Sequence, residues 1–192
     1  MAAEWDRIVQ GIYLDQRPLS EEEVRLLPDL PADFFLNHPL GDFTNALLRD
    51  LIAARKIADE IDHVPTIPDA GHGDGVTPEY MLLGLLRSND TSAAQALRAL
   101  GKEPSTITDE MKTAMKGRIP LSSTQYIGNL TPHSVTVLGD AFSLAGSLNS
   151  PQLTGAHVLA VIAGSAGLAT SVLRSSGVTA EGIRSVVSGT PR

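Results

Sequence analysis

An internal repeat is the feature that most constrains how this 192-residue chain folds. Three segments of similar sequence occur twice in the same order, and the second copies follow the first after 87, 77 and 76 residues. A repeat of this kind indicates two copies of one supersecondary unit, which bury their apolar faces against each other. The paired segments begin at Phe43 and Leu130, at Thr77 and Thr154, and at Ala93 and Ala169.

Each copy has the apolar spacing of helices. From Phe43 onward, apolar residues recur at steps of three and four, which is the period of an amphipathic helix, and no segment requires a strand. We therefore expect an all-α fold of two pseudo-symmetric four-helix repeats in tandem, with a short helical N-terminal extension. The expected helices begin near Phe43, Thr77, Thr91 and Pro104 in the first repeat and near Thr131, Thr154, Ala169 and Thr179 in the second.

The positions of the two copies set the expected boundaries. The first copy is longer by a ten-residue insertion in a loop rich in Pro and Gly, at 65–75. We predict an N-terminal extension at 1–40, a first repeat at 41–116, a connector at 117–129, a second repeat at 130–188 and a tail at 189–192.

The first 40 residues differ from the repeats. They hold four of the eight aromatic residues, and Ser20 with Glu23 forms a capping-box pattern that predicts a short helix at 21–27. Two interpretations stay open for this extension. It packs its aromatic side chains on the main body, or it is an arm that docks on a partner.

Composition excludes several classes of protein. The chain has no cysteine, which excludes disulfides, thiolate metal sites and a cysteine nucleophile. Its net charge of −7 argues against nucleic acid as a partner. Residues 141–173 lack Asp, Glu, Lys and Arg, but polar residues interrupt them too often for a membrane span. Because the first ten residues show no targeting signal, we expect a cytoplasmic protein. We also expect no membrane association and no cofactor.

The charge is unevenly distributed along the chain. Residues 1–100 carry 17 acidic and 8 basic side chains, whereas residues 101–192 carry 5 acidic and 7 basic ones. The first part therefore has a net charge of −9 and the second of +2. We expect cationic, guanidinium-bearing ligands to prefer the first repeat. The weakly charged face of the second repeat is a candidate surface for a partner or for self-association.

The repeated segments resemble the amino-terminal repeat domain of the Clp/Hsp100 unfoldases, the Clp-N or Clp R domain. In that family each repeat opens with an aromatic or aliphatic residue and Thr, and then has a Gly-Thr-Glu-His-Leu-Leu-Leu-Gly-Leu-Leu segment. It continues with an Ala-Ala segment that ends in Leu-Gly. The matches here are Phe43-Thr44, residues 77–86, and residues 93–101 in the first copy, and Leu130-Thr131, residues 154–162 and residues 172–178 in the second.

The resemblance implies a binding protein. Clp-N domains bind protein substrates and adaptors before an ATPase ring acts on them. This sequence has no P-loop motif, since Gly101-Lys102-Glu103 lacks the preceding Gly and the following hydroxyl. We therefore expect a protein- or peptide-binding module that is not an enzyme. It would be an accessory of a Clp protease or chaperone system, namely an adaptor, a decoy or a reader of tagged proteins. Its expected partners are a Clp ATPase or the substrates and adaptors of one.

The resemblance also implies candidate ligand residues. In ClpC-type members each repeat binds phosphoarginine with the Thr that starts the first helix and the Glu that starts the second. The first repeat has both, as Thr44 and Glu79, whereas the second has Thr131 but Ala156 in place of Glu. We therefore expect a phosphoarginine-like pocket in the first repeat and a degenerate one in the second. Helix capping by the two Thr side chains is the alternative role.

The sequence has residues for two other kinds of site. A Clp-N scaffold recruited for catalysis, or for binding a small molecule in the cleft between the repeats, would use His133 or His157 as the acid–base group. Asp69, His72 and Asp74 have the residue types of a metal site, but a glycine-rich loop has the same composition, so we predict no metal.

Overall fold

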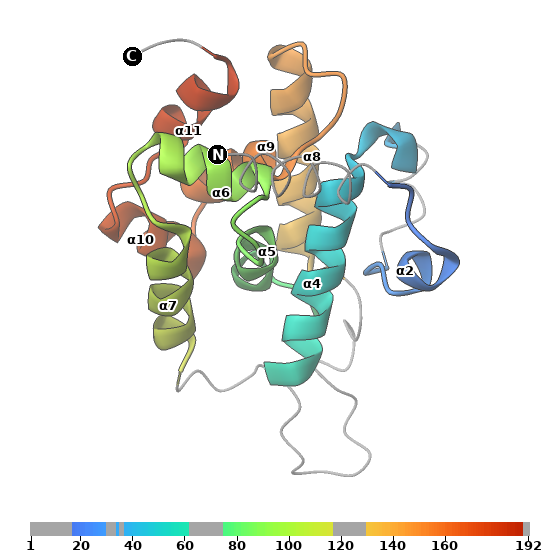
Figure 1. Cartoon of the computed structure of the whole chain (residues 1–192), viewed down its shortest axis with the longest axis horizontal. Helices are drawn as coiled ribbons and strands as arrows, with labels where there is room; N and C mark the ends of the chain where they lie inside the picture. The colour runs from blue at the N-terminus through green and yellow to red at the C-terminus, as the bar shows by residue number, and fades with distance from the viewer. Residues whose placement is uncertain (1–16, 30–33, 35–36, 62–74, 117–129, 190–192) are drawn as a thin grey trace, which may run out of the picture.

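The structure confirms the predicted all-α fold (Figure 1). The computed structural model describes residues 17–29, 34, 37–61, 75–116 and 130–189, which include no β-strand and two isolated β-bridges. The predicted connector at 117–129 and nearly all of the insertion at 65–75 lie outside the described residues. The helices are α2 (Glu21–Arg25), the 3-10 helix η1 (Leu40–Asp42), α4 (Asn45–Ile61), α5 (Pro78–Leu85), α6 (Ser92–Ala99), α7 (Pro104–Met115), α8 (Pro132–Ser147), α9 (Gly155–Gly164), α10 (Leu168–Ser175) and α11 (Ala180–Val187).

Local capping signals place the ends of these helices. Ser20 and Glu23 form the predicted capping box at α2, in which each side chain accepts a hydrogen bond from the backbone N–H of the other residue. Thr131 and Thr179 cap α8 and α11 by accepting from the backbone N–H of the third residue of each helix. After α6, Gly101 adopts a φ of +70°, as the predicted C-cap requires.

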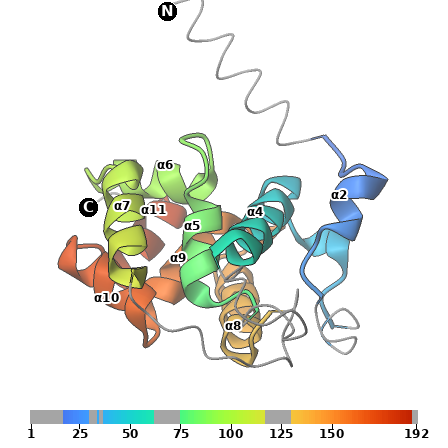
Figure 2. The same ribbon diagram turned by 90° about the horizontal axis from the view of Figure 1, so that it is seen from below.

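Helices α5 and α9 form the centre of the molecule (Figures 1 and 2). Residues 155–163 of α9 are all buried, and so is every residue of α5 except Glu79. Helices α4 and α8 pack against α5 and α9 on one side, and α6, α7, α10 and α11 lie on the other (Figure 2). Among the described residues, no single helix has the length and apolar composition of a membrane span; α9 and α10 reach it only together, across a bend of 93°.

Helices α4 and α5 approach each other unusually closely at Gly84. A Cβ atom at this position would collide with the backbone carbonyl of Asp50 and would lie 2.8 Å from the backbone N of Ala54. Glycine is therefore required here for packing. The equivalent residue of the second repeat, 77 positions later, is the buried Val161.

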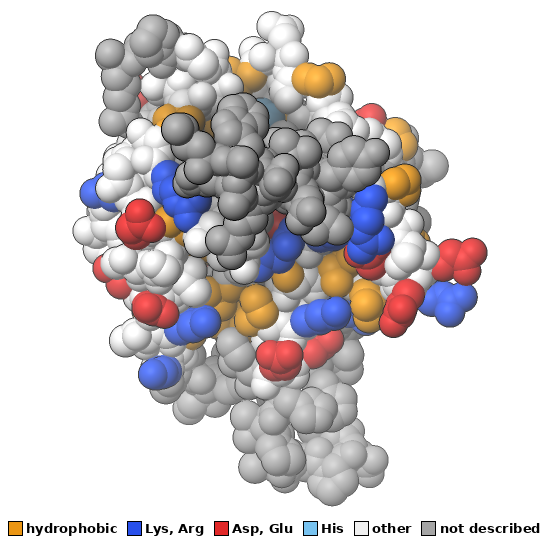
Figure 3. Space-filling view, viewed as in Figure 1, with side chains coloured by type: hydrophobic (Ala, Val, Ile, Leu, Met, Phe, Trp, Pro, Cys, Tyr) orange, Lys and Arg blue, Asp and Glu red, His pale blue; other side chains and the backbone are white. Residues whose placement is uncertain are grey.

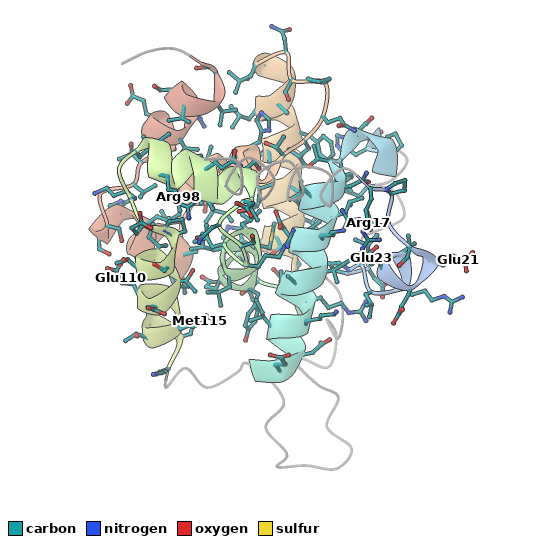
Figure 4. The ribbon with its side chains drawn as sticks, viewed as in Figure 1. Arg17, Glu21, Glu23, Arg98, Glu110 and Met115 are labelled. Carbon is teal, nitrogen blue, oxygen red and sulfur yellow. The ribbon has the colours of Figure 1, made fainter. Side chains whose placement is uncertain are left out.

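The described part of the N-terminal extension packs on α4. Arg49 donates to the carbonyl oxygen of Arg17 at 2.9 Å and to Glu23 at 3.1 Å, and Arg55 donates to the carbonyl oxygen of Leu27 at 2.7 Å. The backbone N–H of Ser20 and then the Arg49 guanidinium lower the pKa of Glu23 to about 2. Figure 4 shows Arg17 and Glu23 between α2 and α4.

Aromatic contacts attach the next part of the extension to α8. The ring of His38 stacks on Phe142 with 4.1 Å between centroids, and Phe34 lies 6.1 Å from the same ring. Phe43, at the start of the first repeat, meets Phe142 edge-on at 4.9 Å. Phe34, the one described residue among the four aromatic residues of the extension, is thus packed on the main body; Trp5, Tyr13 and Phe35 lie outside the described residues.

Candidate functional site

The first helix of each repeat begins beside the second helix of the other repeat. One isolated bridge pairs Phe43 with Leu153 and so brings the start of α4 beside the start of α9. The other pairs Val76 with Leu130 and brings the start of α5 beside the start of α8. We call these places the α4–α9 junction and the α5–α8 junction. Each one joins the first helix of one repeat to the second helix of the other.

This arrangement changes which predicted site residues come together. Thr44 lies at the α4–α9 junction, where its N–H donates to Leu153 at 3.0 Å and its hydroxyl oxygen accepts from Leu47 at 3.3 Å. Glu79 lies on α5, and no hydrogen bond among the described residues joins it to Thr44. Thr131 lies at the α5–α8 junction, where its N–H donates to the carbonyl oxygen of Val76 at 3.2 Å. Thr44 and Glu79 thus lie at the starts of helices that belong to different junctions, and their use as one ligand pocket stays a prediction.

Both predicted Thr residues act as helix caps in the structure. Thr131 accepts a hydrogen bond from the N–H of Ser134 at 3.3 Å, and the Ser134 hydroxyl donates to the carbonyl oxygen of Val76 at 2.7 Å. The capping role expected as the alternative is thus present at Thr44 and Thr131. Ligand binding by Thr44, Glu79 and Thr131 stays a prediction.

Glu79 has a structural contact that the sequence did not reveal. Its Oε1 accepts hydrogen bonds from the backbone N–H groups of Leu168 at 3.2 Å and Ala169 at 3.4 Å, which are the first residues of α10. Gly167, the N-cap residue of α10, has no side chain with which to cap the helix. The carboxylate of Glu79 takes over that role from the other repeat, and its charge suits the positive end of the helix dipole. Its second oxygen, Oε2, has no hydrogen-bond partner among the described residues.

The α4–α9 junction is closed by contacts within the protein. Asp50 is 1% exposed and accepts a hydrogen bond from the Arg87 guanidinium at 2.7 Å. The hydroxyl of Ser92 accepts from the backbone N–H of Ala156 at 3.1 Å. A Cβ atom on Gly155 would lie 3.2 Å from Asp50 Oδ2, so the carboxylate reaches the first turn of α9. Ala156 itself is buried, which leaves no accessible group at the position where the family has Glu.

His157 is a structural residue of α9 rather than part of a group of acid–base side chains. Its Nδ1 accepts from the N–H of Thr154 at 3.2 Å and lies 2.8 Å from the Thr154 hydroxyl oxygen. Nε2 is buried without a hydrogen-bond partner among the described atoms, and burial lowers the pKa of His157. His133 is exposed on the first turn of α8, and no described hydrogen bond connects it to His157 or Asp140. These positions lend no geometric support to the catalytic alternative.

Asp69, His72 and Asp74 lie outside the described residues. Within the described part of the chain, no three His, Asp or Glu side chains are grouped so as to hold a metal ion.

Comparisons with known proteins identify the fold. No protein-family model matches the sequence, and no curated protein matches it either. The structure is similar to a chain from a study of a malarial protein secretion system, with a TM-score of 0.59 and 17% identity over 77% of this chain and 92% of that one. It is also similar to the N-terminal domain of the caseinolytic protease associated chaperone ClpD from Arabidopsis thaliana, with a TM-score of 0.54 and 16% identity over 79% of this chain and 95% of that one. The chain therefore has the fold of a Clp N-terminal domain, as its repeats predicted.

Proposed function

We propose that this chain is a non-catalytic protein-binding module that works with a Clp-type ATPase as an adaptor, a decoy or a reader of tagged proteins. The fold supports this proposal, because one similar structure is the N-terminal domain of a protease-associated chaperone. Such a module needs a surface that recognises a feature of another protein.

The α5–α8 junction is the observation that carries the proposal. Here Glu79 is half-buried at the start of α5, only Oε1 of its carboxylate accepts a hydrogen bond from the described residues, and the start of α8 lies beside the start of α5. A carboxylate suits a guanidinium group, and an unpaired N–H group at a helix start suits a phosphate. At the start of α8, Pro132 has no N–H and the N–H groups of Ser134 and Val135 donate to Thr131, which leaves the N–H of His133 for the anion. His133 is exposed on that first turn and adds a second donor for an anion. The ligand we propose is a phosphorylated arginine side chain of a tagged protein, with its guanidinium on Glu79 and its phosphate on α8.

Calorimetry with a phosphoarginine peptide tests the proposal. The informative variant is Glu79→Gln, because the amide oxygen still accepts from the α10 N–H groups while the negative charge is lost. We expect this variant to bind the peptide at least tenfold more weakly than the wild-type chain. Glu181→Gln is the matched control, since Glu181 is an exposed carboxylate at the same position in the first turn of α11. We expect this control to bind the peptide as the wild-type chain does.

The outcomes separate the parts of the proposal. Equal binding of the phosphoarginine peptide by the wild-type chain and Glu79→Gln would reject this site. A pull-down from the native host with the full chain as bait tests the partner. The proposed function is overturned if the peptide does not bind and the pull-down recovers neither a Clp ATPase nor any of its substrates or adaptors.

A further inference from the structure

We propose that a groove between α7 and α10 binds a short extended segment of a partner protein, in which a lysine or arginine stands next to a small aliphatic residue. The groove has a volume of about 530 Å³ and lies between the last helix of the first repeat and the third helix of the second. Its lining residues are separate from those of the α5–α8 junction. The proposal therefore adds a second binding surface to the function proposed above.

One wall of the groove is a polar stripe on α7. Thr106, Asp109, Glu110 and Thr113 line it, and their spacing of three and four residues places them on the same face of the helix. The stripe rises about 10 Å from Thr106 to Thr113, at 1.5 Å per residue. An extended chain advances about 3.3 Å per residue, so the wall matches about three residues of a bound segment.

The floor and the opposite wall suit a small apolar side chain. Ala114 of α7 and Val172 of α10 line the groove as half-buried and buried side chains. Ser175, one turn after Val172, adds an exposed hydroxyl on the α10 side. An aliphatic side chain of moderate size would gain contacts here without leaving a buried polar group unpaired.

The charges of the groove select a cation. Asp109 and Glu110 are exposed, and no Lys or Arg of the described residues forms an ion pair with either. Oε2 of Glu110 accepts a hydrogen bond from the Ser176 hydroxyl at 2.6 Å, which holds the side chain across the groove and leaves Oε1 available. Figure 4 shows Glu110 on the side of α7 that faces α10, and Figure 3 shows acidic side chains, with Lys and Arg side chains between them, at this edge of the molecule.

Peptide binding measured by fluorescence anisotropy tests the proposal. The probes are fluorescein-labelled Gly-Val-Arg-Ala-Gly and a matched Gly-Val-Gln-Ala-Gly, each with the full chain. We expect the Arg peptide to bind at least tenfold more tightly than the Gln peptide. The double variant Asp109→Asn with Glu110→Gln should lose this preference.

A control of equal charge separates a site from general attraction. Glu21→Gln with Glu22→Gln removes two exposed carboxylates from α2, where Figure 4 shows Glu21 far from the groove. This control should bind the Arg peptide as the wild-type chain does. The proposal is overturned if the control loses as much affinity as the groove variant, or if the groove variant keeps the affinity of the wild-type chain.

Two further measurements fix the place and the kind of ligand. Ser175→Trp keeps both carboxylates and fills the groove, so binding of the Arg peptide should be lost while the circular dichroism of the helices is retained. Amide shifts in the wild-type chain should fall on α7 and α10. Shifts confined to other helices, or equal affinity for arginine amide and for the Arg peptide, would overturn the proposal. The phosphoarginine peptide tests the α5–α8 junction alone, so either site can fail without the other.

Discussion

The two junctions between the repeats have the same backbone frame and opposite chemistry. At each, an isolated bridge places the start of a first helix beside the start of a second helix from the other repeat. The α4–α9 junction is filled by the ion pair of Asp50 with Arg87. The α5–α8 junction keeps the half-buried Glu79, whose carboxylate has one oxygen available. The two repeats thus place their helix starts in the same way, while the side chains at the two junctions differ.

The repeat positions equivalent to the ion pair hold different residues. The residues equivalent to Asp50 and Arg87, 87 and 77 positions later, are Val137 and Gly164. Val137 is buried, so the second repeat fills with an apolar side chain the place that holds a charge in the first. Variants of Asp50, Arg87 and Glu79 test this contrast.

Removing Arg87 should have the largest effect on stability. Arg87→Met takes the guanidinium from a carboxylate that is 1% exposed, and we expect the free energy of unfolding to fall by about 3 kcal/mol. This is the lower end of the range for buried pairs, because the Arg87 side chain remains 27% exposed. Denaturant unfolding measures the change.

The double variant Asp50→Val with Arg87→Met sharpens the comparison, because it gives the first repeat the apolar residue of the second. Its free energy of unfolding should fall by at least about 1 kcal/mol less than the sum of the losses measured for Asp50→Val and Arg87→Met alone. Additive losses would show that the two side chains do not stabilise each other.

Adding a methyl group at Gly84 should be the next most damaging change. Gly84→Ala forces α4 and α5 apart, since the new Cβ would collide with backbone atoms of α4, and we expect a loss of about 2–3 kcal/mol. Gly146→Ala is the matched control, because Gly146 is exposed within α8 and nothing lies within 4 Å of its added Cβ. The control should gain about 0.5 kcal/mol. A tolerated Gly84→Ala would contradict the close approach of these helices.

Truncation of Glu79 should have a smaller and more local effect. Glu79→Ala removes the carboxylate that caps α10, so we expect a loss of about 1 kcal/mol and faster hydrogen exchange at the N–H groups of Leu168 and Ala169. Glu79→Gln keeps an acceptor and should leave their exchange nearly unchanged. If both variants accelerate exchange equally, the charge and not the hydrogen bond holds α10.

The last expected effect is a contribution of His157 to the pH dependence of stability. Burial lowers its pKa from 6.5, so below that pH the unfolded chain binds more protons than the folded one and stability falls as the pH decreases. For one proton the slope is at most about 1.4 kcal/mol per pH unit. His157→Gln keeps an acceptor for the Thr154 N–H and removes the titration. The difference in the free energy of unfolding between the wild-type chain and His157→Gln, measured by denaturant unfolding, should therefore change as the pH falls below 6.5. A difference that stays constant would contradict the lowered pKa of His157.

Local signals explain why so much of the fold could be predicted. Ser20 with Glu23, Thr131, Thr179 and Gly101 act through hydrogen bonds or backbone angles within three or four residues, so their roles are visible in the sequence. The twofold repeat then indicated how the helices are grouped. The candidate site was harder to predict because its contacts are not local, as Glu79 and Leu168 are 89 residues apart.

The sequence by itself determined where the helices begin and end and that they form two related sets, because helix caps and apolar periodicity act over short distances. Only the tertiary structure decided that each first helix begins beside the second helix of the other repeat. It also decided that Glu79 caps α10, that Asp50 is buried with Arg87, and that α7 and α10 enclose a groove. Each of these depends on how two folded repeats pack together, and no pattern within either repeat contains that information.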